Sequence, residues 1–219
     1  MQQKAPTAPA HLTEGDIATL NASGLVKILT SAGSSEFAKA KACQRAGELG
    51  AKEAIPALAA LLSDEKLSTY ARYGLEPMAD PEADAALRAA LGKLKGNLLV
   101  GVVGSLSKRR DAQALPVLAK LMASPDALVA EAATAAVGNI GGAEAAKLLE
   151  GLLAKATGRR QMIVADALLA TAERFFEAGD RASGFRLYAL LSKPGIPMPA
   201  RHAAMGAIIR EERATTRPR

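Results

Sequence analysis

The sequence has little of what a thick globular core normally uses. It contains no Trp and only 3% aromatic residues, although 49% of its 219 residues are hydrophobic. Ala supplies much of that hydrophobic share, and Ala with Leu at helical spacing suits thin layers of closely packed helices. The scarcity of aromatic side chains also argues against a platform on which the bases of a single-stranded nucleic acid stack.

Cysteine, histidine and long apolar runs are also scarce. Cys43 is the single cysteine, so an internal disulfide and a cysteine-based zinc cluster are excluded. The two histidines, His11 and His202, have no Cys or carboxylate at a ligand spacing, so we expect no metal, no cofactor and no catalytic residue. The longest apolar run, Leu98–Leu106, is too short to cross a bilayer, and membrane insertion is not expected.

The N-terminal stretch "MQQKAPTAPAHLTEG" lacks an apolar leader region, which favours a cytoplasmic location. A periplasmic or exported location stays open if a signal peptide was removed. We expect residues 1–22 to form a flexible arm.

Positive charge gathers toward the C-terminus. The formal net charge is +6 and the isoelectric point is near 9.5. Residues 1–158 hold 17 Lys and Arg against 16 Asp and Glu, whereas residues 159–219 hold 11 against 6. An acidic partner is therefore expected to meet the C-terminal third first.

An internal repeat organises most of the chain. Small or aliphatic residues recur at Ala42, Ala71, Val102 and Ala133, with spacings of 29, 31 and 31 residues. Four residues after each of them comes a second apolar position, one helical turn along the same face: Ala46, Leu75, Leu106 and Val137. Shorter helices are predicted between these, over residues 54–62, 82–93, 112–123 and 143–156. About 30 residues per helix pair, stacked in series, predicts an α-solenoid.

The stretch Leu67–Glu76 holds two of the three tyrosines. Aligned on the repeat, Tyr70 and Tyr73 fall opposite Gly101 and Gly104, 31 residues later. Because a ring fills the space that a missing side chain leaves, we expect both tyrosines to pack across the repeat boundary rather than to bind a ligand. Arg72 and Glu76, four residues apart, are expected to pair on the outer side of this helix.

The glycine-rich and acidic motifs have structural explanations. "GNIGG" at residues 138–142 joins two helices with no strand before it, so a turn is favoured over a phosphate-binding loop. Asp80 before Pro81 is typical of a helix N-cap, which accounts for the acidic run "ADPEAD" without a metal.

The repeat resembles a known family. "VAEAATAAVGNIGGAEAAKLL" and "RAGELGAKEAIPALAALL" are similar to the bacterial, phycobilisome-lyase-like HEAT repeat. "YARYGLEP" and "GKLKGNLLVGVV" are similar to the N-terminal repeats of planctomycete and verrucomicrobial HEAT-repeat proteins. The resemblance implies an all-α, right-handed α-α superhelix of the HEAT/ARM type with about five to six helix pairs. It also implies a bacterial scaffold protein.

The C-terminal third has a different sequence pattern. Residues 166–197 resemble a tetratricopeptide hairpin, with Phe175, Gly184 and Tyr188 near that pattern. We therefore expect a flexible arm over 1–22 and a HEAT-repeat solenoid over 23–158. Tetratricopeptide-like or HEAT-like helices continuous with the solenoid follow over 159–213, and a basic tail over 214–219.

These features favour a non-catalytic scaffold that binds another protein through the concave face lined by the second helix of each pair. We expect the scaffold itself to be a monomer. One alternative is phosphate-backbone binding to a nucleic acid through the C-terminal basic clusters, and another is an accessory subunit of an enzyme such as a lyase-type complex. The candidate partner-binding residues are Arg72, Tyr73, Glu76, Lys108, Arg109, Arg110, Arg159 and Arg160.

Overall fold

The computed structural model describes residues 13–216, and across that range the chain is helical with no β-strand. The all-α fold class predicted from the sequence is confirmed. The chain divides into two compact units, one ending at Ser105 and the other beginning at Leu106. We call them unit 1 and unit 2.

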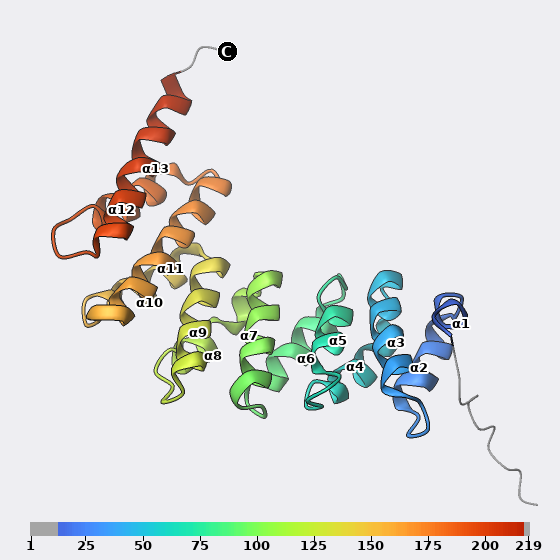
Figure 1. Ribbon diagram of the computed structural model, residues 1–219. Coiled ribbons are helices and arrows are strands. Elements are labelled where there is room, and N and C mark those ends of the chain that lie inside the picture. The colour runs from blue at the N-terminus through green and yellow to red at the C-terminus, as the bar shows by residue number, and fades with distance from the viewer. Residues whose placement is uncertain (1–12, 217–219) are drawn as a thin grey trace, which may run out of the picture. The chain divides into compact units, whose positions relative to one another are not determined.

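Unit 1 holds a series of short helices joined by tight turns (Figure 1). Its helices are α1 (Glu14–Ala18), α2 (Ala22–Thr30), α3 (Glu36–Leu49), the 3₁₀ turn η1 (Lys52–Ala54), α4 (Ile55–Leu61), α5 (Ser68–Leu75) and α6 (Pro81–Leu91). Helix α7 (Gly96–Arg109) begins in unit 1 and ends in unit 2.

Unit 2 continues the alternation of longer and shorter helices (Figure 1). It contains the 3₁₀ turn η2 (Ala112–Ala114), α8 (Leu115–Leu121), α9 (Ala127–Ile140), α10 (Gly142–Leu153), α11 (Gly158–Glu177), α12 (Arg181–Leu191) and α13 (Met198–Thr216). We call α3, α5, α7, α9 and α11 the first helices, and α4, α6, α8, α10 and α12 the second helices.

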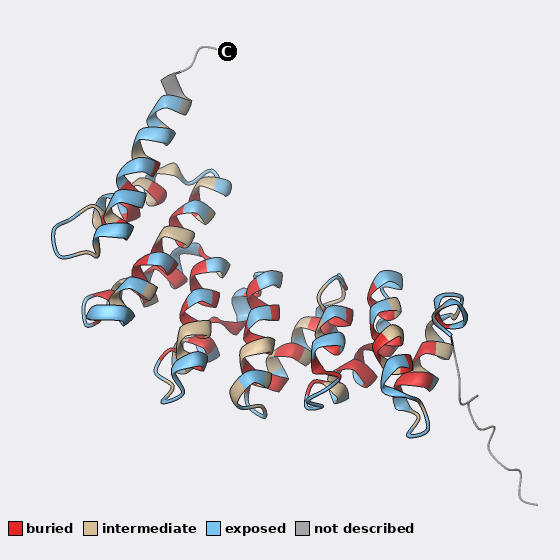
Figure 2. Ribbon diagram, in the orientation of Figure 1, coloured by how far each residue is buried: buried red, intermediate tan, exposed pale blue. Residues whose placement is uncertain are grey.

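The predicted repeat positions form the core. Ala42, Ala71, Val102 and Ala133 are all fully buried, and so are the residues one turn further on, Ala46, Leu75, Leu106 and Val137. Val164 and Leu168 continue the pattern into α11, 31 residues after Ala133 and Val137. Figure 2 shows the buried residues along the sides of the helices that face one another in each unit. The periodicity read from the sequence therefore identifies the buried stripe.

Small residues let neighbouring first helices approach closely. A Cβ added to Gly74 in α5 would lie 2.7 Å from the carbonyl oxygen of Cys43 in α3. A Cβ added to Gly138 in α9 would lie 2.5 Å from the carbonyl oxygen of Ala167 in α11. Backbones this close leave no room for a larger side chain at these two contacts.

The turns follow the local sequence. Asp80 caps α6 by accepting a hydrogen bond from the backbone N–H of Glu82, and Pro81 stands at the first helical position, as predicted. Gly141 and Gly142, with φ of 73° and 86°, end α9 and begin α10. The "GNIGG" segment is therefore a helix–helix turn, which confirms its structural interpretation.

The packing predicted for the tyrosines is wrong. The exposed fractions of Tyr70 and Tyr73 are 37% and 51%, and no atom lies within 4 Å of where a Cβ on Gly104 would stand. The space beside Gly101 is taken by the guanidinium of Arg72, which would lie 2.8 Å from a Cβ there. The long arginine side chain, and not a tyrosine ring, crosses from α5 to α7.

The predicted domain boundaries also need correction. Residues 14–18 of the expected flexible arm form α1, and Ile17 of that helix is buried. Residues 1–12 and 217–219 lie outside the described residues. At the other end, residues 214–216 belong to α13. Helix α11 packs closely on α9 and α10.

Candidate functional site

The structure buries two of the predicted partner-binding residues. The side chains of Arg72 and Glu76 are only 17% and 7% exposed, and their nearest nitrogen and oxygen atoms are 4.0 Å apart. The carboxylate of Glu76 accepts a hydrogen bond from the Ser105 hydroxyl at 2.8 Å, which joins α5 to α7 inside unit 1. The pairing was predicted correctly, but its outer position was not. Glu76 thus links α5 to α7, and most of both side chains is covered by neighbouring residues.

Tyr73, by contrast, lies on the surface, as do the other two aromatic side chains of unit 1. Phe37, Tyr70 and Tyr73 are 52%, 37% and 51% exposed, and they project from the first helices α3 and α5. They are all the aromatic residues that unit 1 contains. We call these three residues the aromatic face.

A groove of about 410 Å³ lies between α3 and α5 beside this face. Phe37 and Tyr70 line it together with the charged side chains of Glu36, Lys41 and Lys66. The ammonium of Lys66 forms an ion pair with Glu36, and that of Lys41 stands 5.9 Å from the centre of the Phe37 ring. The groove therefore combines apolar walls with a charged rim, as ligand-binding clefts usually do.

The cluster at the end of α7 is only partly solvated. Arg110 adopts a left-handed backbone conformation with φ of 54°, just after the helix ends. Its guanidinium donates to the carboxylate of Glu177 at 3.2 Å, and Glu177 also accepts from Arg174 at 2.8 Å. Lys108 is exposed and Arg109 is half-buried. This cluster is thus tied to the C-terminal end of α11.

The other predicted cluster opens a pocket in unit 2. Arg159 and Arg160 stand in the first turn of α11, at the rim of a pocket of about 300 Å³. Met122, Ala130 and Ile163 contribute apolar walls, and Glu131 stands opposite the arginines. We call this site the arginine pocket.

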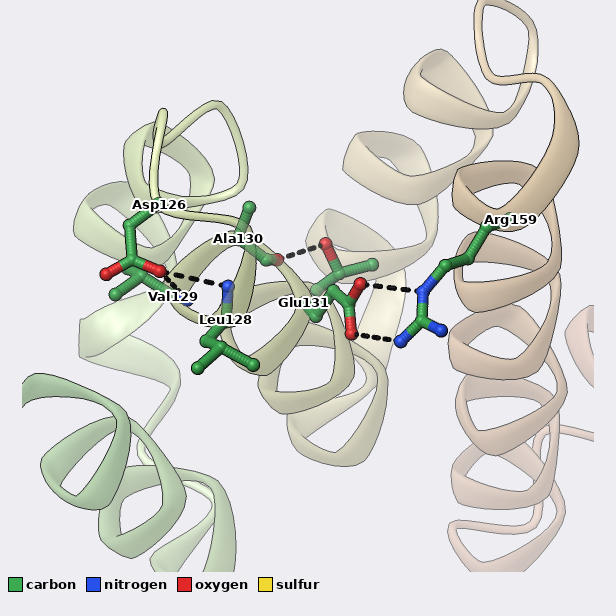
Figure 3. Close-up of polar contacts among 7 residues, drawn as sticks. Asp126, Leu128, Val129, Ala130, Glu131 and Arg159 are labelled. Atoms are coloured by element: carbon green, nitrogen blue, oxygen red, sulfur yellow. Dashed lines mark hydrogen bonds and ion pairs between the residues drawn. The ribbon is translucent and has the colours of Figure 1, made fainter. Parts of the chain in front are cut away.

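Both arginines are held by neighbouring elements. Nε and Nη2 of Arg159 donate to the two carboxylate oxygens of Glu131, each at 2.9 Å, in the bidentate arrangement drawn in Figure 3. Nη2 of Arg160 donates to the carbonyl oxygen of Met122 at 3.0 Å. Asp126 caps α9 from the adjoining turn, because it accepts from the N–H groups of Leu128 and Val129 (Figure 3).

The bidentate ion pair shifts the pKa values of both Glu131 and Arg159. The hydrogen bond from Arg159 lowers the pKa of Glu131 below its usual value, and the same bond raises the pKa of Arg159. The lowered pKa means that the Glu131 carboxyl is ionised at neutral pH.

The two basic clusters do not converge. Arg110 reaches Glu177 at the last residue of α11, whereas Arg159 stands near its first residue. Eighteen residues of α-helix separate the two positions, which corresponds to ~27 Å along the axis. The structure gives these clusters separate acidic partners, Glu177 and Glu131.

Sequence reasoning missed Phe37 and Glu131. Phe37 lies five residues before Ala42, and Leu128 lies five residues before Ala133. These equivalent positions are 52% and 61% exposed, so the repeat marks an outward-facing site that could have been recognised. Glu131 and Arg159 are 28 residues apart, and an acid and a base near the repeat distance are a signal for a contact between neighbouring first helices.

Other functional signals are weak in the part of the chain that the structure describes. Between residues 13 and 216 there is no group of three His, Cys, Asp or Glu side chains suited to hold a metal ion. Within the same residues, no helix combines the length and the apolar character that spanning a membrane requires. His202 lies in a pocket of about 470 Å³ with Tyr188 and Arg210.

Comparisons with known proteins support a repeat architecture. Residues 110–141 match the family model of the Armadillo/beta-catenin-like repeat. This confirms the predicted resemblance to repeat proteins of the HEAT and armadillo type. The segment begins just after the end of α7 and covers η2, α8, α9 and Gly141, the residue between α9 and α10.

Among solved structures, the chain is similar to an engineered protein studied by crystallography in a structural genomics programme. The sequences are 21% identical, the TM-score is 0.49, and the match covers 89% of this chain and 57% of the engineered one. The chain thus spans little more than half the length of that protein. No curated protein matches the chain.

Proposed function

We propose that the protein is a non-catalytic scaffold that binds another protein through the aromatic face of unit 1. A helical repeat fold is compatible with such a role, because stacked helices present extended surfaces to a partner. The observation that carries the proposal is the position of Phe37, Tyr70 and Tyr73. Every aromatic side chain of unit 1 lies on its surface, and none fills its core.

This distribution is not what folding alone favours. Burying a large aromatic side chain stabilises a fold by about 1.5–3 kcal/mol, so an aromatic residue kept in solvent forgoes that gain. Unit 2 shows the usual arrangement, since Phe175 and Tyr188 are 8% and 1% exposed. Aromatic residues are enriched in the energetic centres of protein interfaces, where one ring contributes both area and directed contacts.

The groove beside the face suits an apolar anchor from a partner. Phe37 and Tyr70 form its apolar walls, while Lys41 and Lys66 exceed Glu36 by one positive charge. A partner that inserts an apolar side chain between the rings would desolvate them and keep its polar groups at the charged rim. The hydroxyl groups of the tyrosines add directional contacts at the edge.

The first helices fit this role better than the second helices do. Among the described residues of unit 1, α4 and α6 expose no large apolar side chain. The sequence favoured the concave face lined by the second helices as the binding surface. The proposal instead uses α3 and α5, because that is where the exposed rings stand.

Affinity capture with matched variants tests the proposal. The tagged full chain and the double variant Phe37→Ser/Tyr70→Ser would be used to capture proteins from a native lysate treated with nuclease. A partner retained by the wild type and by Leu49→Ser, but lost with the double variant, would support binding at the face. Leu49 is a suitable control because it is also on α3 and 44% exposed. Equal capture by all three proteins would contradict the proposal.

A further inference from the structure

The arginine pocket of unit 2 is a second binding element with a defined chemistry. It lies among the end of α8, the exposed turn that follows, α9 and the first turn of α11. Its volume of about 300 Å³ is at the lower end of the range for ligand sites. Met122 and Ile163 line its apolar part, and the guanidinium groups of Arg159 and Arg160 stand at the rim.

The rim carries hydrogen-bond donors that the described contacts do not use. A guanidinium has five N–H donors and no acceptor. Arg160 makes one hydrogen bond, to the carbonyl oxygen of Met122, and Arg159 uses Nε and one N–H of Nη2 on Glu131. The remaining N–H groups of two positioned guanidiniums are therefore available to an incoming oxygen anion.

The charge of the pocket points to an anion. Two arginines and one acid, Glu131, line it, which leaves an excess of one positive charge. The first turn of α11 contains no acidic residue. Cations are unfavourable there because the positive end of the helix dipole lies in the same place. Helix stability therefore does not account for the two arginines. Glu131 accounts for Arg159, whereas Arg160 has no carboxylate partner among the described residues and donates only to the carbonyl oxygen of Met122.

We propose that the arginine pocket binds an acidic peptide segment of a protein partner. An aliphatic side chain of the segment packs on Met122, Ala130 and Ile163, and an adjacent carboxylate accepts hydrogen bonds from Arg160 and Arg159. This inference deepens the proposed scaffold function and rests on it. It adds a second contact surface. The specificity of the arginine pocket comes from charge, whereas the specificity of the aromatic face comes from contacts with aromatic rings.

A peptide fits the pocket better than a nucleic acid does. None of the residues that line it is aromatic, so no base can stack there. The other basic cluster lies at the opposite end of α11, ~27 Å away along that helix, and Arg110 in it is already paired with Glu177. One charged rim beside an apolar wall matches a short segment that alternates acidic and aliphatic residues.

A peptide selection followed by binding measurements tests the inference. A library of random 12-residue peptides displayed on phage would be panned on the full chain. An enriched peptide would then be labelled with fluorescein and titrated by fluorescence anisotropy. We expect acidic residues next to an aliphatic one. We also expect at least a tenfold weaker affinity when these acids are replaced by Asn and Gln, or when the protein carries Arg160→Gln.

Two further variants separate binding from folding. Ala130→Leu fills the pocket and leaves both arginines in place. It is therefore expected to lower the affinity for the peptide as strongly as Arg160→Gln does. Arg186→Gln is the matched control, because Arg186 is an exposed cation of the same unit that pairs with Glu150. Its affinity for the peptide should equal that of the wild type.

Three results would overturn the inference. They are enriched peptides without acidic residues, peptide affinity unchanged in both Arg160→Gln and Ala130→Leu, and Arg160-dependent binding of a 20-nucleotide single strand that is tighter than that of the peptide. The scaffold proposal is tested separately, because Phe37→Ser/Tyr70→Ser leaves the arginine pocket intact. Peptide binding that persists in that variant, together with unchanged protein capture, would place the failure in the aromatic face alone.

Discussion

Gly138 of α9 stands directly against the backbone of Ala167 in α11, where a Cβ would come within 2.5 Å of the alanine carbonyl oxygen. The contact is reinforced by Thr171, whose hydroxyl is 3.3 Å from the carbonyl oxygen of Gly138. The same relation occurs in unit 1, where a Cβ on Gly47 would meet the carbonyl oxygen of Gly74 at 2.8 Å. In both units, therefore, a first helix packs on the next through a missing side chain.

Gly138→Ala is expected to destabilise the protein. The obstacle is a backbone atom that cannot rotate away, and overpacking of this kind costs about 1–3 kcal/mol. Gly151→Ala in α10 is the control, because nothing lies within 4 Å of its added Cβ. There, alanine should stabilise the helix by ~0.5–1 kcal/mol relative to glycine. Urea unfolding followed by circular dichroism measures both changes, and a lowered midpoint in both variants would contradict this explanation.

Gly101 and Arg72 are expected to be energetically coupled. A Cβ on Gly101 would lie 2.8 Å from Nε of Arg72, a buried nitrogen for which the described residues supply no hydrogen-bond partner. Gly104→Ala, in open space on the same helix, should stabilise by ~0.5–1 kcal/mol, and Gly101→Ala should gain less or lose stability. In an Arg72→Ala background the two substitutions should become equivalent. A double-mutant cycle from urea unfolding gives the coupling free energy between the two positions. If the two changes in the free energy of unfolding are additive, the Arg72 guanidinium moves aside at no cost and the explanation is wrong.

The thiol of Cys43 is expected to be unreactive toward disulfide reagents until the protein unfolds. The side chain is fully buried, and desolvation raises its pKa from 9.0 to about 12. The thiolate needed for reaction with a disulfide reagent is therefore absent in the folded state at pH 8. Ellman's reagent should detect no thiol in buffer and one thiol in urea. Rapid reaction in buffer would indicate that α3 opens locally.

The same shift predicts a dependence of stability on alkaline pH. Between pH 9 and about 12 the unfolded chain releases the Cys43 proton while the folded chain retains it. The free energy of unfolding should thus be unaffected by this group below pH 9 and should fall by ~1.4 kcal/mol per pH unit above it. Cys43→Ala should lack this component, so the two proteins should differ in slope. If the free energy of unfolding falls with pH at the same slope in both proteins, the assignment of this pH dependence to Cys43 is wrong.

Glu131 is expected to titrate below a typical glutamate because Arg159 donates to it. In Arg159→Gln the carboxyl should regain a pKa close to 4.5. Since the folded pKa is depressed, the contribution to stability is present above the unfolded value and is lost as the pH falls through the folded value. Carbon-detected NMR of the side-chain carboxyl measures the midpoint in the wild type and in the variant. An unchanged midpoint would mean that the pair does not persist in solution.

The repeat predicted from sequence was accurate for the buried stripe, because a period of about 30 residues and a four-residue step fix which face of each helix is apolar. It failed for contacts between neighbouring helices. The observed pairs are Gly47–Gly74, Arg72–Gly101, Glu76–Ser105 and Gly138–Ala167, and each is two residues closer in sequence than its repeat spacing. These four contacts therefore join positions that are offset by two residues and are not equivalent in the repeat. The tyrosine prediction assumed that equivalent positions touch one another.

The candidate site was harder to predict than the fold. Arg159 and Arg160 could be singled out as a charge cluster, but their acceptors, Glu131 and the carbonyl oxygen of Met122, come from other helices. The exposure of Tyr73 depends on how α5 is rotated about its own axis. The long side chain of Arg72 occupies the space between α5 and α7, and composition does not reveal that arrangement.

Site-specific photocrosslinking tests the central claim most directly. A benzoyl-phenylalanine would replace Tyr73 on the aromatic face, or Ala89, an exposed position on the second helix α6 of the same unit. Both proteins would be expressed in the native host and irradiated there. The proposal predicts a discrete protein adduct from position 73 that is absent from position 89. An adduct from position 89 alone would contradict it and would place the binding surface on the second helices.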